Sequence, residues 1–347
     1  MATLAAALPV FAVTMPASAP SDGGDVTLVV YDSFPTEGTS LNDALGRFTD
    51  ETGIDVHIVV AGDTGTMVSK AVLTAGNPEG DVMWGVDNTY LSRVIDGGVF
   101  DPYVAAGLDD VPAALRAGVD DGIATPVDFG DVCVNDDLAW FADHDLDPPA
   151  DLEALADPAY RDLLVVEDPA ASSPGLAFLL ATIARYGDDG WADYWSRLTA
   201  NGVEVADGWT EAYYDRFSGA GDGDRPLVVS YGTSPPAEVL FADPPIDAPT
   251  TGVIADTCFR QVEYAGVLRG TDAPDAAHRL VDFLLTPAFQ SEIALNLFVY
   301  PANDTVGLPA AFTDFAVVPA HPATLGPDTI AAHRQSWIET WTDVVLR

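Results

Sequence analysis

Strands and helices alternate over the first third of the chain, and this alternation constrains the fold more than any other feature. Three apolar runs rich in β-branched residues predict buried strands: TLVVYDSF (27–34), IDVHIVVAG (54–62) and GDVMWGVDN (80–88). Segments with helical spacing of apolar residues follow them, at 41–52, 66–76 and 89–100. This order favours a parallel sheet with helices on both faces, as in α/β proteins.

Each of these strands ends in polar or aromatic residues. Ligands of open α/β sheets bind beyond the carboxyl ends of the strands, so these ends predict the wall of a binding crevice. The polar and aromatic residues concerned are Tyr31, Asp32, Ser33, Asp63, Thr64, Asp87 and Asn88.

A second α/β unit occupies the middle of the chain. Its strands and helices are predicted from the segments 163–187, 190–202, 202–208, 209–221 and 226–235. Two extended segments flank this unit, at 125–135 and 258–268. A chain that leaves one lobe and later returns must cross twice, and two crossing strands side by side would form a hinge. More helices are predicted at 274–285, 287–295 and 327–345.

The only two cysteines, Cys133 and Cys258, lie in the two crossing segments. The hinge would place them near each other, and an exported protein with two cysteines can hold one disulfide. The alternative is a pair of buried free thiols, which behave as small hydrophobic side chains. We predict lobe 1 from 25–127 plus 257–322, and lobe 2 from 128–256 plus 323–347, with a ligand cleft between them.

The N-terminus resembles a secretory signal. Residues 2–14 are almost all apolar and precede the small residues Ala17-Ser18-Ala19. The usual basic segment before the apolar run is missing, and no lipid-anchor cysteine follows it. We therefore set residues 1–24 apart as a signal-like segment and expect an exported protein at the outer face of the cell membrane.

Acidic residues exceed basic ones by 54 to 14, which gives a formal net charge of −40 at pH 7. The carboxylates are scattered along the chain, and their mutual repulsion opposes compaction unless salt screens it. The charge therefore indicates a salt-rich setting, such as that of a halophilic archaeon; the alternative is a surface for cationic partners. Because no basic stripe is present, nucleic acid is a poor partner.

The segment DPAASSPGL predicts the start of a helix. Ser172 or Ser173 can cap this helix, whose first turn contains Pro174 and Gly175. A helix N-terminus can bind a phosphate or hydroxyl group, although capping alone explains the same residues.

Aromatic residues gather in the segment WTEAYYDRF. Trp209 stands at a strand-to-helix junction, and Tyr213 and Tyr214 follow. These rings could pack in the core, or they could stack on a flat ligand, where a cation over an indole gains about 0.5–2 kcal/mol.

The stretch VVSYGTSPP (228–236) does not support a hydrolase. The nucleophile elbow is G-x-S-x-G, but Val228 stands two positions before Ser230. None of the five histidines lies in a strand-end loop with a serine signature. No zinc, calcium-loop, Walker A or dinucleotide motif occurs either. We therefore expect no catalytic residue, no metal site and no cofactor.

Several motifs occur in a characteristic order from about residue 27 to the C-terminus. They are YDSF, DVMWGVDN, EDP-x-x-S-x-PG, GW-x-EAY, LVVSY-x-TSP, QVEYAGVL, L-x-TPAFQ and the W-x-x-x-W ending. Together they resemble the thiamine-binding subunits of bacterial and archaeal ABC importers. The resemblance implies an α/β, two-lobed periplasmic-binding-protein-like fold of type 2, with mixed sheets flanked by helices and with crossing hinge strands.

The resemblance also implies a function and a set of ligand contacts. The protein would hold thiamine or a thiamine phosphate between its lobes and deliver it to the membrane permease and ATPase of an importer. Ser172 matches a serine that serves a hydroxyl or phosphate, and Trp209 and Tyr231 match aromatics around the ligand. The complete predicted set is Tyr31, Asp32, Ser33, Asp63, Thr64, Asp87, Asn88, Ser172, Ser173, Gly175, Trp209, Tyr213, Tyr231, Ser234, Phe298 and Tyr300.

Two positions depart from the family pattern. A family tyrosine six positions after Tyr231 falls on Ala237. A family tryptophan falls on Phe298, although the following Tyr300-Pro301 pair is retained. The set of aromatic side chains around the ligand therefore differs from that of the family.

Two other functions stay open at this point. Tyr213-Tyr214 suggests a ferric-ion binder of the same fold, since such proteins use adjacent tyrosines. A hydrolase of thiamine phosphates is the less favoured alternative. We expect a monomer.

Overall fold

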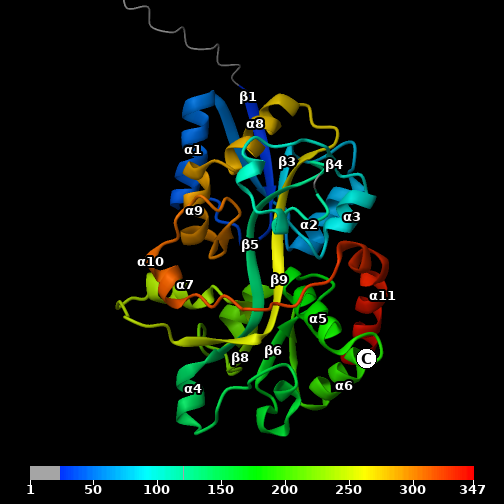
Figure 1. Ribbon diagram of the computed structural model, residues 1–347, viewed down its shortest axis with the longest axis vertical. Helices are drawn as coiled ribbons and strands as arrows, with labels where there is room; N and C mark the ends of the chain where they lie inside the picture. Colours follow the sequence, from blue (N-terminus) through cyan, green and yellow to red (C-terminus); the bar gives the residue numbers. More distant parts are fainter. Residues whose placement is uncertain (1–23, 120) are drawn as a thin grey trace, which may run out of the picture.

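The computed structural model describes residues 24–119 and 121–347 (Figure 1). The signal-like segment predicted at 1–24 lies outside these residues, except for Gly24. Two lobes lie one above the other in Figure 1, and the long strands β5 (Thr125–Asp137) and β9 (Thr251–Leu268) run from one to the other. The predicted two-lobed α/β fold with crossing strands is confirmed.

One mixed sheet passes through both lobes. The described strands follow the order β2-β1-β3-β9-β5-β8-β6-β7, with β4 added to β9 and β10 to β5. The shorter strands are β1 (Gly24–Val30), β2 (Ile54–Val60), β3 (Val82–Asp87), β4 (Phe100–Asp101), β6 (Leu164–Glu167), β7 (Glu204–Ala206), β8 (Leu227–Tyr231) and β10 (Tyr300–Pro301).

Each lobe keeps the predicted parallel pairing, and the crossing strands add the antiparallel part. In the upper lobe β1 is parallel to β2 and β3, and in the lower lobe β6 is parallel to β7 and β8. The pairs β3–β9, β5–β9 and β5–β8 are antiparallel. Two parallel halves are thus joined into one mixed sheet at the crossing.

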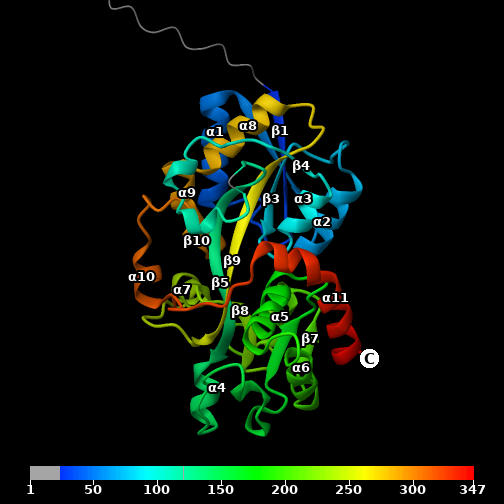
Figure 2. The same ribbon diagram turned by 45° about the vertical axis from the view of Figure 1, so that its right-hand side comes forward.

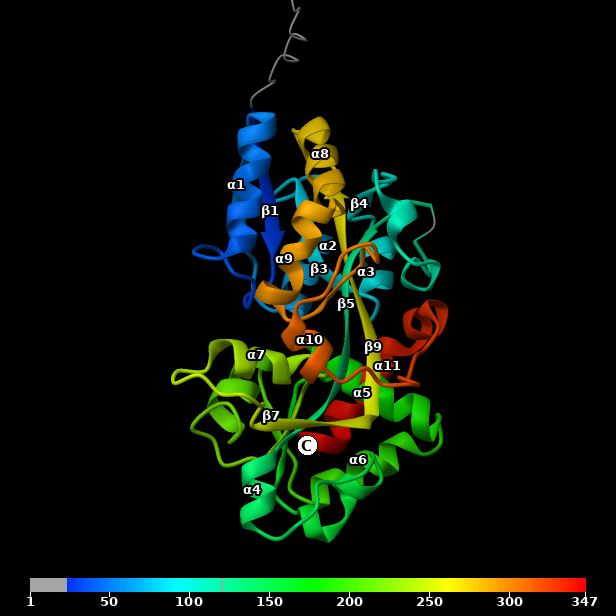
Figure 3. The same cartoon turned by 60° about the vertical axis from the view of Figure 1, so that its left-hand side comes forward.

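Helices lie on either side of the sheet in both lobes (Figures 1 and 3). Those of the upper lobe are α1 (Ser40–Thr52), α2 (Thr64–Leu73), α3 (Leu91–Asp96), α8 (Pro274–Leu284) and α9 (Pro287–Leu297). Those of the lower lobe are α4 (Leu138–Asp143), α5 (Ser173–Tyr186), α6 (Trp191–Ala200), α7 (Ser234–Phe241) and α11 (Pro327–Val345). Short 3₁₀ turns occur at Leu108–Asp110, Ala113–Leu115, Ala154–Ala156 and Pro158–Tyr160.

Helix α10 (Ala310–Phe315) lies beside α7 of the lower lobe in Figures 1 and 2. The predicted lobe boundaries assign this helix to lobe 1, because it falls within 257–322. The boundaries themselves stay a prediction.

Local sequence explains where α1 begins and ends. The Thr39 hydroxyl accepts a hydrogen bond from the backbone N–H of Asn42, whose side chain accepts one from the backbone N–H of Thr39 in return. This reciprocal cap satisfies two N–H groups that a helix start leaves free. Leu45 and Phe48 are buried on one face of the helix, and Gly53 ends it at φ 72°.

Some helices differ from the prediction. The segment 209–221, predicted as a helix, forms only a short π-helical stretch, Glu211–Arg216, because Phe217 is extended and bridges to Arg225. Helices α4, α7 and α10 are not predicted. Two consecutive prolines, Pro235 and Pro236, are typical of a turn, but here they lie in the first turn of α7. Proline is favoured at this place in a helix, because the N–H that it lacks would have no partner there.

A disulfide joins the two crossing strands. It links Cys133 of β5 to Cys258 of β9 across a sequence separation of 125 residues. The β5–β9 register shifts between Val132 and Val134, and there the Thr257 hydroxyl accepts a hydrogen bond of 2.8 Å from the Val134 N–H. The disulfide therefore spans the bulged part of the ladder, where backbone pairing is interrupted.

An ion pair next to the disulfide also joins the crossing strands. The Arg260 guanidinium of β9 donates two hydrogen bonds, of 2.6 and 3.1 Å, to the carboxylate of Asp131 on β5. The same guanidinium lies 5.1 Å from the ring centroid of Phe129. A bidentate pair with one buried partner holds its geometry better than an exposed pair.

We expect the double variant Cys133→Ser/Cys258→Ser to lose about 2–4 kcal/mol of unfolding free energy, because the disulfide closes a long loop in the unfolded chain. Urea unfolding in molar salt, with and without a reductant, measures this loss. Reductant should destabilise the wild type to the same level and leave the double variant unchanged. An unfolding midpoint that is equal in both proteins under oxidising conditions would contradict the expectation.

Candidate functional site

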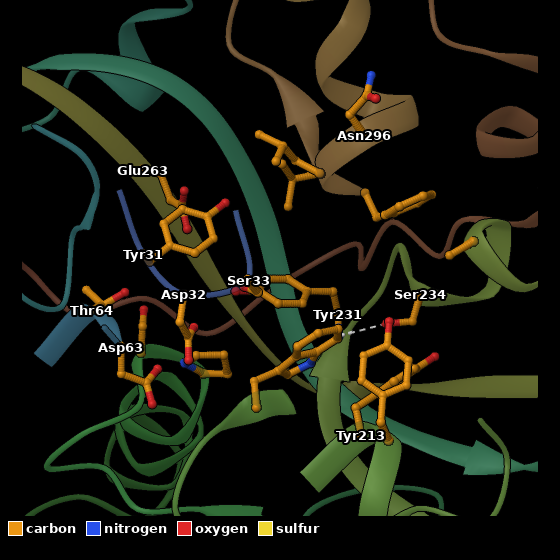
Figure 4. Close-up of a pocket in the computed structure, with 18 of the residues that line it drawn as sticks. Tyr31, Asp32, Ser33, Asp63, Thr64, Tyr213, Tyr231, Ser234, Glu263 and Asn296 are labelled. Carbon is orange, nitrogen blue, oxygen red and sulfur yellow. Dashed lines mark hydrogen bonds between the residues drawn. The ribbon is translucent and has the colours of Figure 1, made fainter. Parts of the chain in front are cut away.

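A cavity of about 270 Å³ lies between the two lobes, next to the crossing strands (Figure 4). Its volume is close to the lower end of the range for small-molecule sites, about 300–1,000 Å³. The carboxyl ends of β1 and β8, the start of α2 and α5, and the end of α9 all contribute to the wall. The structure thus brings strand ends of both lobes to one cavity.

Most of the predicted ligand-binding residues line this cavity. They are Tyr31, Asp32, Ser33, Asp63, Thr64, Ser173, Trp209, Tyr213, Tyr231, Ser234 and Phe298. Ala237, the position of the missing family tyrosine, lines it as well.

Asp87 and Asn88 do not reach the cavity. Asp87 is fully buried and accepts hydrogen bonds from the backbone N–H and the hydroxyl of Thr89. The Asn88 side chain pairs with the backbone of β9, through Arg260 O and Val262 N, at 3.1 Å each. Both residues therefore stabilise the loop after β3 and its contact with the crossing strand.

Ser172, Gly175 and Tyr300 are also outside the lining. Ser172 is fully buried, and its hydroxyl caps α5 by accepting from the Gly175 N–H, so the capping interpretation fits and the helix presents Ser173 instead. A Cβ at position 175 would lie 2.5 Å from Glu167 O, so this glycine permits close packing. Tyr300 is buried and stacks on Phe129 with a centroid distance of 5.2 Å.

Tyr31 forms one aromatic wall of the cavity. Its ring lies over β3 at Gly85, where a Cβ would come within 2.2 Å of the ring carbon Cδ1. Gly85 has a φ of 111°, a conformation that glycine adopts without strain. A glycine at this position therefore makes room for the ring beside the cavity.

Trp209 and Tyr231 also line the cavity, and serine side chains hold them in position. The Trp209 indole N–H donates to the Ser230 hydroxyl at 2.9 Å, and Ser230 shares a 2.9 Å hydrogen bond with the Ser234 hydroxyl. Ser234 in turn accepts from the Tyr231 N–H at 3.3 Å, and the Trp209 ring stacks on Tyr213 at 5.0 Å. Ser230, which is fully buried, thus positions an aromatic ring and is not available as a nucleophile.

Three carboxyl groups complete the lining, namely those of Asp32, Asp63 and Glu263. Burial, together with the neighbouring charge of Asp32, raises the pKa of Asp63 to about 7. Burial also raises the pKa of Glu263 well above its usual value, and the carboxylates of Asp128 and Asp87 raise it further. Since none of the described lining residues is Lys, Arg or His, the site suits a cation or a hydrogen-bond donor.

Tyr214 and Pro174, which the sequence places in candidate segments but not in the predicted ligand-binding set, also line the cavity. The sequence did not indicate five further lining residues, which are Phe241, Glu263, Asn296, Leu297 and Val299. For two of them, Glu263 and Phe241, the sequence does hold a clue to their position. Glu263 is an acidic residue inside the predicted strand CFRQVEYAGVL, where a buried charge is rare unless it has a role. Phe241 follows Ala237 by four positions, so both lie on one face of α7.

Phe241 supplies an aromatic ring next to the gap at Ala237. It packs on Phe298 from the other lobe, with a centroid distance of 5.3 Å and an interplanar angle of 73°. Its side chain is 67% exposed, so it lies at the rim of the cavity. Phe241 therefore places an aromatic ring one helical turn after Ala237.

The rings of the two adjacent tyrosines are nearly perpendicular to each other. The ring planes of Tyr213 and Tyr214 are 85° apart, and the Tyr213 hydroxyl donates to Glu238 Oε1 at 3.3 Å. Among the residues that the structure describes, no group of three or more His, Cys, Asp and Glu side chains is placed to hold a metal ion.

The sequence profile of the family described as "Bacterial extracellular solute-binding protein" matches residues 78–324. The chain belongs to this family. The chain is 29% identical over 325 residues to the "Thiamine-binding periplasmic protein" of Escherichia coli. This match covers 93% of the chain and 94% of the relative. The protein of the same name from Salmonella typhimurium is 28% identical over 322 residues, with 93% and 94% coverage.

The fold comparison agrees with the family. A solved structure titled "Periplasmic thiamin binding protein" superposes with a TM-score of 0.81 at 28% sequence identity, and the match covers 93% of this chain and 96% of that one. The resemblance inferred from the motifs is therefore confirmed. In the part of the solute-binding chain that the structure describes, every helix is too short or too polar to cross a lipid bilayer.

Buried carboxyl groups should make the stability depend on pH. Asp128 is fully buried, and burial raises its pKa, so the folded protein keeps its proton to higher pH than the unfolded chain does. Its contribution to stability is full below the unfolded pKa of about 4 and is lost as the pH rises through the folded pKa. We expect Asp128→Asn to flatten the fall in unfolding free energy between pH 5 and 8.

Urea unfolding at several pH values in molar salt measures this slope. Glu153→Gln is the control, because Arg197 lowers the pKa of this exposed carboxyl to about 2 and it does not titrate in that range. Equal slopes for the wild type and Asp128→Asn would show that Asp128 does not hold a proton in the folded protein.

Proposed function

We propose that this protein captures thiamine or a thiamine phosphate outside the cytoplasm and delivers it to an ABC importer. The observation that carries the proposal is the cavity between the lobes, whose described lining combines aromatic rings and carboxyl groups and includes no basic side chain. Relatives named as thiamine-binding periplasmic proteins, which match over almost the whole chain, support the choice of ligand.

The chemistry of thiamine fits these walls. Its thiazolium ring carries a permanent positive charge, and a cation over an aromatic face gains about 0.5–2 kcal/mol. The flat aminopyrimidine can stack between rings such as those of Tyr31 and Tyr231. The hydroxyl or phosphate end can meet Thr64 and Ser173, which stand at the first turns of α2 and α5.

Binding between two lobes supplies a mechanism for delivery. A ligand that contacts both lobes favours the closed state, and β5 and β9 are the connection about which the lobes would turn. The closed surface would then be recognised by the membrane permease and its ATPase. In this role the protein acts as an exported monomer that needs no cofactor and catalyses no reaction.

Calorimetry in molar salt tests the ligand directly. We expect heat and one-to-one binding with thiamine, thiamine monophosphate or thiamine diphosphate. An absence of heat with all three would remove the proposal.

A ferric-ion binder is the second candidate, because Tyr213 and Tyr214 both line the cavity. A visible tyrosinate-to-iron charge-transfer band after addition of ferric citrate would favour it. A hydrolase fits less well, since Ser230 is fully buried and hydrogen-bonded to Trp209.

We expect Tyr231→Ala to weaken thiamine binding about tenfold, because the removed ring stands at a strand end facing the ligand. The melting temperature should change little, since the ring is only half-buried. Calorimetry and thermal unfolding measure the two effects. Tyr231→Phe keeps the aromatic face and is the matched control, which should retain most of the affinity. Equal affinities of the alanine variant and the wild type would show that this ring is not part of the site.

A further inference from the structure

Three strands place carboxyl groups in one row at the crossing. Glu263 of β9 is in register with Asp87 of β3 on one side and with Asp128 of β5 on the other. Residues in register on neighbouring strands point to the same face of a sheet. The row therefore brings three acidic side chains together, and its central member lines the cavity.

The two outer members of the row have hydrogen-bond donors, but the central one does not. Asp87 accepts from Thr89, and Asp128 Oδ2 accepts from the Trp84 indole N–H at 3.0 Å. Among the described residues, no donor reaches the buried oxygens Glu263 Oε2 and Asp128 Oδ1. A buried polar atom without a partner costs about 1–3 kcal/mol, and either a proton on the pair or a positively charged ligand at the cavity wall would relieve this cost.

Within residues 24–119 and 121–347, the ionisable groups that interact electrostatically with Glu263 are acids. These groups are Asp87 on β3, Asp128 on β5, Tyr31 after β1 and Tyr231 at the end of β8. Arg260, three residues earlier on β9, is held by its two hydrogen bonds to Asp131. Figure 4 shows the Glu263 carboxyl beside the ring of Tyr31, on the wall of the cavity.

Without a ligand, an ionised Glu263 would stand next to other acids in a partly dry site. Burial and the neighbouring carboxylates raise the pKa of Glu263 well above its usual range, and burial raises that of Asp128. The empty site is therefore more stable when a proton is bound to this pair. A cation that enters the cavity reverses this preference, because it stabilises the ionised form.

We propose that Glu263 is the counter-ion for the cationic ring of the ligand, and that the Glu263–Asp128 pair releases a proton to solvent when the ligand enters. This inference rests on the proposed function and specifies how the same site selects a cation. The carboxyl O–H bond breaks, its electron pair stays on the oxygen, and the proton passes to the buffer. The positive charge of the ligand replaces that of the proton, so the net charge of the cavity does not change.

The linkage between ligand binding and proton release determines how the affinity for the ligand changes with pH. If binding releases a proton, affinity rises with pH until the pair is already ionised in the empty protein, and it levels off above that point. A neutral compound in the same cavity does not replace the positive charge of the proton, so its binding does not require the pair to ionise. The aminopyrimidine alcohol that lacks the thiazolium ring is such a compound.

Calorimetry with thiamine at pH 7 in molar salt, repeated in buffers of different ionisation enthalpy, measures the number of protons released. We expect up to one proton per thiamine for the wild type and fewer for Glu263→Gln, in which only Asp128 of the pair is left to ionise. The glutamine variant should bind thiamine at least about tenfold more weakly, because an interfacial charge pair is lost. Its affinity for the neutral aminopyrimidine alcohol should equal that of the wild type.

Asp136→Asn is the matched control. Asp136 is also a buried carboxyl of β5, with a pKa raised to about 6 chiefly by burial, but it does not line the cavity. This variant should release as many protons as the wild type and bind thiamine with the same affinity. Thermal unfolding verifies that each variant is folded, and the measurement on the wild type does not depend on any variant.

The outcomes separate the inference from the proposed function. If the wild type binds thiamine without releasing protons, or if Glu263→Gln binds it as tightly, the inference is overturned and the proposed function stands. If the wild type binds neither thiamine nor its phosphates, both are overturned. Proton release that is lost in Asp136→Asn but kept in Glu263→Gln would also overturn the assignment to Glu263.

Discussion

The antiparallel pairing of β5 with β9 is the constraint on which the rest of the structure depends. These two strands are the longest of the described sheet, and they connect one parallel half to the other. A bulge interrupts their ladder, and there the Cys133–Cys258 disulfide and the Asp131–Arg260 pair hold them together. Because both lobes are built outward from this crossing, it determines which strand ends meet in the cavity.

The site combines two kinds of wall, and each depends on residues behind it. Ser230 holds the Trp209 indole, while the absence of a side chain at Gly85 makes room for the Tyr31 ring. The carboxyl wall is different, because Glu263 has no such support and stands beside other acids. Aromatic rings and an unpaired carboxyl in one cavity lining suit a flat cation, which agrees with the proposed ligand.

Much of the first lobe's part of the site follows from sequence alone. Tyr31 and Asp32 lie at the end of one predicted strand and Asp63 directly follows another, and the carboxyl ends of neighbouring parallel strands lie at one edge. The same rule fails for Asp87, because β9 covers that strand end and the carboxylate turns to its own loop. Phe241 could not be placed from sequence, since it reaches the cavity only when α7 packs beside Phe298 of the other lobe.

By itself the sequence determined the order of strands and helices, the two crossing segments and the aromatic residues at the strand ends, because periodicity and turn residues act over a few neighbours. Only the tertiary structure decided which side chains face the cavity and which carboxyl groups are buried together. Asp87, Glu263 and Asp128 are distant in the chain and become a row through the register of three strands. Burial and neighbouring charge arise from such long-range contacts, so the properties of these carboxyl groups could not be read from local sequence.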